Sequence, residues 1–456
     1  MAYLLIVYVL ALAFIAFVSA SKVKSVSDFF VARKGGSALM VSGSLLATIL
    51  GGSAVIGAVD TGPYLGGAAT WFLLSGAMGL LALLPFLPKI MKIRRFTLPD
   101  MVEDLYGKGP RTVASIVIPL AWTGVVAAQI IAAAKLLQSF VGMEYSVAAI
   151  VSAIVFVGYT VFGGQISVLR TDFLQAALII SGIFVLVFFA GRTPALHPEE
   201  VAFAFPFNAN FSPFDLILLL LTYATTYTAG PDMFSRLFCA KNEKTAEKSI
   251  LASAMILAVV AACIGFLAQY GAFLPNETGG ARIIEIGKMV LPGPLFPLLG
   301  LCLLSVVLSS ADTTLLSSSI IFTQLVSRKN LDDRAEIRRT RLVIVVNGLL
   351  ALAIALLFKD IIAMLLLALA VYAGAFTLPI LFGLAGLRVK SKFISAAILA
   401  GGGLALLGKL IPSSSIPHLG DFFLVLAFVV NGALLFCGRI RNAPELLSLK
   451  KRFNPR

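Results

Sequence analysis

Long apolar stretches alternate with short polar segments along the whole sequence. A helix that spans a membrane needs about 20 mostly apolar residues. Thirteen stretches of this kind lie near 2–20, 38–62, 67–88, 113–141, 146–162, 171–190, 214–235, 249–274, 295–326, 341–358, 361–385, 393–411 and 421–438. The pattern predicts an all-α integral membrane protein with about thirteen transmembrane helices. The first stretch lacks a charged leading segment and a cleavage site, so we expect it to be a retained helix.

Two of these stretches contain helix-breaking residues at equivalent places, five stretches apart. The 38–62 stretch contains Gly51-Gly52, and the 214–235 stretch contains Gly230-Pro231. Glycine exposes the backbone and proline removes a helical hydrogen bond. In lipid the freed groups must find partners in protein, water or a ligand. Matched interruptions of this kind indicate a transporter site between inverted repeats, whereas a single glycine would only allow close helix packing.

The 295–326 stretch carries a polar run, SSADTTLLSSS, inside an apolar span. Most hydroxyls in such a run hydrogen-bond carbonyls of their own helix. A carboxylate at this depth costs about 2.5–3.5 kcal/mol and therefore needs a cation, a proton or a partner. Ser309, Asp312 and Thr313 share one helix face by their spacing. Hydroxyl, carbonyl and carboxylate oxygens suit an alkali cation better than a transition metal.

The composition supports the membrane interpretation. Hydrophobic residues make up 59% of the chain, charged residues 13%, and the mean hydropathy is +0.99. Soluble domains are about 45–50% apolar and about 25% charged. This balance excludes a soluble enzyme, a disordered scaffold and a secreted disulfide module. The two histidines are too few for a histidine-rich metal site, and the four cysteines are widely spaced.

The basic residues behind the net charge of +14 indicate how the chain is oriented in the membrane. Thirty of the 36 Lys and Arg residues, Arg236 among them, fall in alternate loops and in the 439–456 tail. Cytoplasmic loops of membrane proteins carry this excess of positive charge. We therefore expect a multi-pass protein of the cell (plasma) membrane with its N-terminus outside and its C-terminus in the cytoplasm. Because the positive charge is explained in this way, no nucleic-acid partner is expected.

Five motifs resemble the sodium/solute symporter family, in the same order over most of the chain. They are ATILGGSAVIG (47–57), FTLPDMVEDLYG (96–107), YTVFGGQISVLRTDFLQA (159–176), GPDMFSRLFCAKNEKTA (230–246) and SSADTTLLSSS (309–319). The resemblance implies a LeuT-like 5+5 inverted repeat within one transporter domain, 1–456. Its parts would be an extra N-terminal helix (2–20), two repeats (38–190 and 214–385), two C-terminal helices (393–438) and a cytoplasmic tail (439–456).

By the same resemblance, a sodium ion would bind between the 38–62 and 295–326 spans. The implied ligands are the backbone carbonyls of Ala47, Leu50 and Val306. The side-chain hydroxyls of Ser309 and Ser310 would complete the set.

Some family members bind a second sodium ion with an Asp at the start of the 171–190 span. Asp172 matches that position, with Thr313 as a candidate co-ligand. We expect Asp172 to lie at the cytoplasmic mouth of its helix within reach of water; a helix-capping role is the alternative. Asp312 is a further candidate for ion or proton coupling.

Five residues are candidates for solute binding, on weaker grounds: Gly52, Ser53, Lys135, Tyr223 and Tyr227. The tyrosines could equally pack in the interior. Lys135 could extend to the membrane interface, or it could attract a solute carboxylate together with amides freed at the glycine break. The pocket positions differ from those of the proline and sugar carriers, so the motifs do not identify the cargo.

Together these features predict a sodium-coupled secondary active symporter, not an enzyme. It would import a small organic solute of the amino-acid, carboxylate, sugar or vitamin class by alternating access, with Na+ as the coupling ion. The alternative is a proton-coupled transporter of the same fold. Its other partner is the lipid bilayer, and no obligatory protein partner is evident.

Overall fold

The computed structural model describes residues 2–440 except 22, 93–95, 194–204, 273, 275–280, 327–331 and 412–418. This part of the chain is helical and contains no β-strand. The long helices are α1 (Ala2–Ala20), α3 (Ala38–Ile49), α6 (Thr70–Ala82), α9 (Lys108–Val141), α10 (Tyr145–Ala190), α14 (Glu243–Gly271), α16 (Phe296–Val326), α17 (Asp333–Leu357), α18 (Ile361–Leu384), α19 (Ser391–Leu410) and α20 (Leu419–Cys437). The predicted tail 439–456 lies outside the described residues from 441 onward.

Shorter helices complete the predicted spans and the connections between them. They are α2 (Val26–Val31), α4 (Ala58–Asp60), α5 (Gly62–Leu65), α7 (Leu87–Lys92), α8 (Leu98–Tyr106), α11 (Pro213–Leu219), α12 (Thr225–Ala229), α13 (Pro231–Cys239) and α15 (Arg282–Val290). Two single π-helical turns, η2 (Ser53–Gly57) and η5 (Leu220–Ala224), lie in the two spans that contain the predicted breaks. Single π turns inside α-helices often mark functional sites.

Every one of the predicted apolar stretches falls on helix, which confirms the all-α membrane fold. Within the described residues, nine helices are long and apolar enough to cross a membrane, or ten if the bent pair α3 and η2–α4 is one span. The α10 helix carries two predicted stretches, and α1 and the α11–α13 series carry the remaining two. The total of thirteen spans stays a prediction.

The α10 helix is broken inside. Gly164 has φ 53° and ψ −162°, a backbone conformation that only glycine adopts readily. The neighbouring Gly163 leaves room for Ser167, whose Cβ would lie 2.1 Å from an added methyl group. This glycine pair separates the predicted 146–162 and 171–190 stretches. It lies in the motif 159–176, which the sequence singled out.

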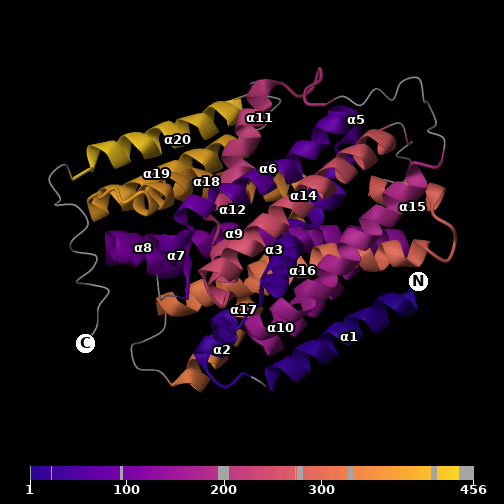
Figure 1. Ribbon diagram of the computed structural model, residues 1–456, viewed down its shortest axis with the longest axis horizontal. Coiled ribbons are helices and arrows are strands. Elements are labelled where there is room, and N and C mark those ends of the chain that lie inside the picture. The colour runs from indigo at the N-terminus through magenta and orange to yellow at the C-terminus, as the bar shows by residue number, and fades with distance from the viewer. Residues whose placement is uncertain are drawn as a thin grey trace.

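The helices differ in how much protein surrounds them. In α16 and α9, 89% and 83% of the most apolar window is buried inside the protein, whereas in α20 the share is 22%. In Figure 1, α1 lies along one edge of the molecule beside α10, and α18, α19 and α20 lie together at another edge. Large apolar side chains face outward on these edge helices, such as Phe17 (71% exposed) and Phe436 (62% exposed). Lipid is the solvent for such a surface.

Candidate functional site

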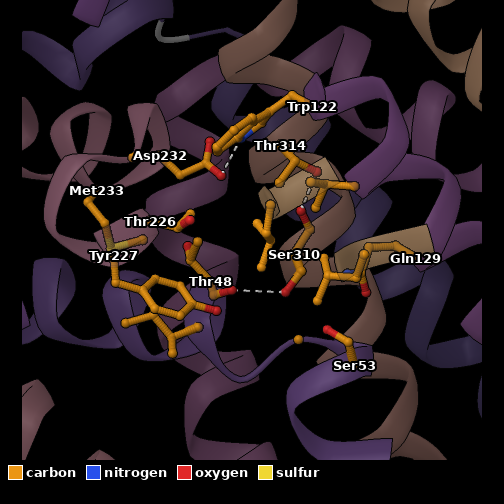
Figure 2. Close-up of a pocket in the computed structure, with 16 residues that line it drawn as sticks. Thr48, Ser53, Trp122, Gln129, Thr226, Tyr227, Asp232, Met233, Ser310 and Thr314 are labelled. Carbon is orange, nitrogen blue, oxygen red and sulfur yellow. Dashed lines mark hydrogen bonds between the residues drawn. The ribbon is translucent and has the colours of Figure 1, made fainter. Parts of the chain in front are cut away.

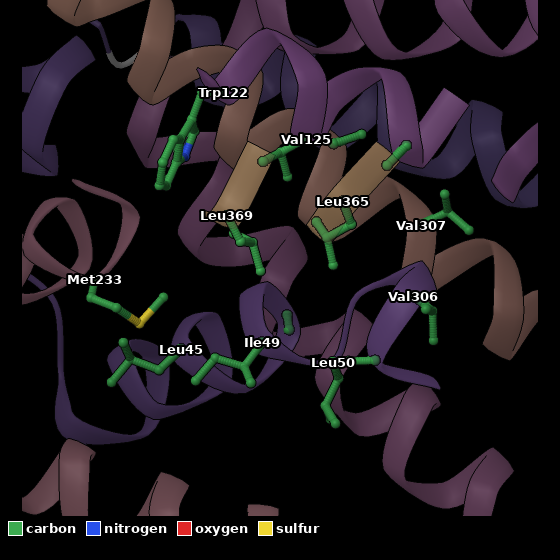
Figure 3. Packing of buried hydrophobic residues seen from close by; sticks show 14 of the residues in the cluster. Leu45, Ile49, Leu50, Trp122, Val125, Met233, Val306, Val307, Leu365 and Leu369 are labelled. Atoms are coloured by element: carbon green, nitrogen blue, oxygen red, sulfur yellow. The ribbon is translucent and has the colours of Figure 1, made fainter. Parts of the chain in front are cut away.

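The first predicted break lies between α3 and η2. The α3 helix ends at Ile49, Leu50 has φ −76° and ψ 51°, and the chain bends by 57° before it continues. The freed amide of Gly52 donates a hydrogen bond to Oε1 of Gln129 on α9, at 3.1 Å. A buried glutamine on a neighbouring helix therefore replaces the lost helical partner. Apolar side chains from α3, α9, α13, α16 and α18 enclose this region (Figure 3).

The second predicted break lies between α12 and α13. Gly230 has extended φ and ψ of −72° and 143°, and Pro231 begins α13, where its missing N–H costs nothing. A Cβ on Gly230 would lie 2.3 Å from the carbonyl oxygen of Thr226, so only glycine fits. Gly51 and Gly230 both line one cavity. The two matched interruptions thus meet in the interior.

Four of the five predicted sodium ligands, Ala47, Val306, Ser309 and Ser310, come together between α3 and α16, and no hydrogen bond among the described residues joins the Leu50 carbonyl to them. Ser309 Oγ lies 2.9 Å from the carbonyl oxygen of Ala47 and 3.3 Å from that of Val306. Ser310 Oγ lies 3.4 Å from the same Ala47 oxygen and 3.1 Å from the carbonyl oxygen of Thr48. We call Ala47, Val306, Ser309 and Ser310, with Leu50 at the end of α3, the neutral oxygen group.

The neutral oxygen group suits an alkali cation. The two hydroxyls now donate to carbonyls, and rotation of their hydrogens would turn oxygen lone pairs toward a central ion. Carbonyl and hydroxyl oxygens without a carboxylate form a weak, hard ligand set. Gly51 leaves space for the Ser310 hydroxyl here, because a Cβ would lie 2.6 Å from Ser310 Oγ and would have to displace it. The backbone of the break therefore approaches the Ser310 side chain of α16 closely.

One helical turn further along α16 lies a group of charged side chains. Asp172 on α10 accepts a hydrogen bond from the Ser44 hydroxyl. Its Oδ2 also lies 3.4 Å from Nη2 of Arg236 on α13, and both side chains are fully buried. Arg236 donates to the Thr313 hydroxyl of α16. The two predicted ligands of a second sodium ion, Asp172 and Thr313, are therefore both engaged by a protein cation.

Asp312 adds a second carboxylate to this group. It is 1% exposed, its Oδ1 lies 3.4 Å from the Thr313 hydroxyl, and its Oδ2 has no hydrogen-bond partner among the described residues. We call Asp172, Arg236, Asp312 and Thr313 the charged group. It contains two acids and one base, so it has room for one more positive charge, either a proton or a cation.

Three expectations about this region are wrong. Asp172 lies about two helical turns beyond the Gly164 break, where backbone amides already have helical partners, so it is not a helix cap. It is also 0% exposed, not within reach of water. Arg236, which we counted with the cytoplasmic loops, is a fully buried side chain. Asp172 and Arg236 can both be buried because each charge compensates the other inside the protein.

The cavity between the two breaks is mixed in character (Figure 2). Its polar lining residues are Thr48, Ser53, Gln129, Thr226, Tyr227, Asp232, Ser310 and Thr314, and Trp122, Met233, Leu365 and Leu369 are among its apolar ones. Its volume for water-sized occupants is about 40 Å³, and about 10–15 Å³ on this scale holds one water. An organic solute therefore needs these helices to move apart.

Sequence reasoning missed Asp232, the one acidic side chain among the described residues that line the cavity. Its Oδ2 accepts a hydrogen bond from Nε1 of Trp122 on α9 at 2.7 Å. Its Oδ1 accepts a hydrogen bond from the Ser317 hydroxyl of α16. The signal was present, because the acid directly follows the Gly230-Pro231 break.

The predicted solute-binding residues divide into two sets. Ser53 and Tyr227 line the cavity, and Gly52 is at the break beside it. Tyr223 is buried and packs against Phe72, with ring centroids 5.4 Å apart. Lys135 is half-buried and does not belong to the cavity lining. The lining thus gives no geometric support for Lys135 as a partner of a solute carboxylate.

A helical membrane protein with two broken helices around a central cavity has the architecture of a secondary transporter. The family model described as "Sodium:solute symporter family" matches residues 29–401. The chain therefore belongs to the sodium:solute symporter family, whose members are transporters and not enzymes.

Individual relatives agree with this assignment. The sodium/proline symporter of Haemophilus influenzae is 27% identical over 408 residues, which cover 82% of this chain and 79% of the relative. An uncharacterized symporter, YwcA of Bacillus subtilis, is 21% identical over 398 residues, 80% of this chain and 77% of the relative.

Solved structures show the same fold. A Na+-coupled sialic acid symporter, in a substrate-bound outward-open state, matches with a TM-score of 0.80 and 18% identity over 97% of this chain and 98% of that chain. A nucleobase-cation-symport-1 family transporter matches with a TM-score of 0.60 and 11% identity over 93% of this chain and 97% of that chain. The predicted family and fold class are confirmed.

Proposed function

We propose that this protein imports a small organic solute by sodium-coupled symport with alternating access. The observation that carries the proposal is the neutral oxygen group, which joins the break of α3 to α16 through Ser309 and Ser310. A sodium ion there would hold the two helices together. Because Thr48 and Ser310 also line the cavity, the same ion would set the shape of the solute site.

The cation gradient supplies enough energy for this task. One sodium ion that enters down about −100 mV releases about 2.3 kcal/mol. A tenfold concentration gradient adds about 1.4 kcal/mol. The total of about 3.7 kcal/mol supports roughly 500-fold accumulation of a neutral solute.

The charged group is a candidate for a second coupling ion. Asp172 and Thr313 would bind a second sodium ion only after Arg236 leaves them, because Arg236 engages both. In the alternative, proton-coupled form, Asp312 is the better proton carrier. Asp172 and Asp312 each have one oxygen without a hydrogen-bond partner in the described structure, but Asp172 is the one that pairs with Arg236. We place the N-terminus outside and the C-terminus in the cytoplasm, in keeping with the distribution of basic residues.

Thermal unfolding of the purified protein tests the proposal without knowledge of the solute. Sodium should raise the melting temperature when it replaces potassium at constant ionic strength and pH, because it binds only the folded state. Ser309→Ala and Ser310→Ala each remove one ligand, and each should raise the half-maximal sodium concentration by about tenfold, or about 1.4 kcal/mol.

Thr323→Val is the matched control for these variants. It removes a buried hydroxyl of α16 that bonds only its own helix, to the Ser319 carbonyl at 2.8 Å. Its sodium dependence should equal that of the wild type. If both serine variants behave like this control, the assignment of the sodium site to Ser309 and Ser310 is wrong. A protein that responds to pH and not to sodium would favour the proton-coupled form.

A further inference from the structure

Asp232 lies where a transported solute would meet it. It is the second residue of α13, directly after the break, and its side chain lines the cavity. One neutral donor reaches each carboxylate oxygen, the Trp122 indole on Oδ2 and the Ser317 hydroxyl on Oδ1. A carboxylate in the first turn of a helix is also favoured by the helix dipole. These contacts hold Asp232 in place, and each oxygen keeps a lone pair for one further donor.

No described lining residue neutralises this acid. Among the described residues that line the cavity, the remaining polar side chains are hydroxyls, the Trp122 indole and the Gln129 amide, with no lysine or arginine. Arg236 is one helical turn along α13 from Asp232, but it donates to Thr313 and pairs with Asp172. Arg236 thus acts on Asp232 only from a distance, and the described cavity lining offers a carboxylate that no cation contacts directly, whereas Asp172 in the charged group has a direct partner.

Aromatic rings line the same space. Trp122 and Tyr227 belong to the cavity lining (Figure 2). The Trp122 ring is held by the Tyr372 ring, with centroids 4.5 Å apart. A cation over such faces gains about 0.5–2 kcal/mol, and aromatic cages with this composition recognise ammonium groups. A carboxylate next to aromatic walls is poorly suited to an anionic solute.

On this basis we infer that the solute carries an ammonium group, and that Asp232 is the residue that recognises it. The inference rests on the proposed symport function and narrows its solute class from organic molecules in general to amines or quaternary ammonium compounds. The ammonium group lies against Asp232 between Trp122 and Tyr227. The rest of the solute faces the hydroxyls near the break of α3.

Matched pairs of compounds test this inference on the purified, full-length protein in saturating sodium. Each pair consists of an ammonium compound and its neutral carbon isostere, such as choline and 3,3-dimethylbutan-1-ol. Free carboxylates and a neutral sugar complete the panel. At least one ammonium compound should raise the melting temperature, and its isostere should bind at least about tenfold more weakly. Asp232→Asn should abolish this difference between the two members of the pair.

The sodium-induced thermal shift of each variant is measured in parallel, since it reports folding and the ion site independently of the solute. If Asp232→Asn does not fold, Trp122→Phe replaces it. That change removes one donor but keeps the negative charge, so the preference for the ammonium compound should persist. The inference is overturned if neutral or anionic compounds bind best. It is also overturned if no compound binds while the sodium shift persists, or if Asp232→Asn keeps the preference. Loss of the sodium shift in the wild type would instead overturn the proposed function.

Discussion

Two buried polar groups lie one helical turn apart along α16, and their polar atoms are compensated in opposite ways. The neutral oxygen group consists of carbonyls and hydroxyls that hydrogen-bond one another, such as Ser309 with Ala47 at 2.9 Å. The charged group pairs Asp172 with a cation that the protein supplies, Arg236, at 3.4 Å. Both groups contain residues that the sequence suggested as sodium ligands. The two groups differ in charge, because the charged group contains two carboxylates and an arginine and the neutral oxygen group contains neither.

This difference predicts how each group responds to change. A neutral group loses little when the ion leaves, because its hydroxyls return to the carbonyls. In a charged group, removal of one partner leaves the other charge buried without compensation, which typically costs 3–5 kcal/mol. Reversible binding of a coupling ion therefore suits the first group. In the second group, an ion can enter only when the arginine moves.

The largest expected effect follows loss of the arginine. Arg236→Gln leaves Asp172 and Asp312 without a buried counter-ion, and we expect it to lower the free energy of unfolding by about 3–5 kcal/mol. Asp172→Asn in the same chain should restore most of that loss, because one buried charge disappears with its partner. Thermal unfolding of the single and double variants in potassium measures this coupling. Additive losses in the double variant would show that the pair is not a unit.

A smaller effect should appear in the sodium response of the same variants. Without Arg236, the oxygens of Asp172 and Thr313 become available to sodium, so the sodium-induced thermal shift of Arg236→Gln should exceed that of the wild type. The double variant with Asp172→Asn should lose this excess, because the amide has no charge. An equal sodium shift in all three proteins would mean that the charged group binds no sodium even when the arginine is absent.

The sequence predicted the parts of this molecule that depend on local physics. The membrane-spanning helices could be predicted from the sequence because lipid requires long apolar helices with internal hydrogen bonds. The matched breaks at Gly51-Gly52 and Gly230-Pro231 could be predicted because glycine and proline interrupt a helix at their own positions in the sequence. Both breaks lie at the cavity that the structure contains. The neutral oxygen group came from the family resemblance, and its two hydroxyls lie within hydrogen-bonding distance of the Ala47 carbonyl, that of Ser309 also of the Val306 carbonyl.

Features that depend on how helices are rotated and paired could not be read in this way. The π-helical turn η5 contains Tyr223, and nothing in the sequence indicates this departure from regular α-helix. Tyr227 lines the cavity, while Tyr223 lies behind it and packs against the rings of Phe72 and of Tyr227 itself. The pairing of Asp172 with Arg236 joins α10 to α13, and nothing in the spacing of either residue indicates the other. Sequence position alone therefore assigned Arg236 to a loop.

The smallest expected effect tests the neutral group by geometry alone. A Cβ on Gly51 would lie 2.6 Å from Ser310 Oγ, so Gly51→Ala must displace that hydroxyl without any change of charge. We expect about threefold weaker sodium binding, or about 0.65 kcal/mol, measured as the sodium dependence of the melting temperature. Gly403→Ala on α19 is the control, since nothing lies within 4 Å of its added Cβ. It should leave the sodium dependence unchanged. Because the neutral group holds its ion by the positions of uncharged oxygens, a displaced hydroxyl must weaken binding. Wild-type sodium dependence in Gly51→Ala would remove Ser310 from the ligand set.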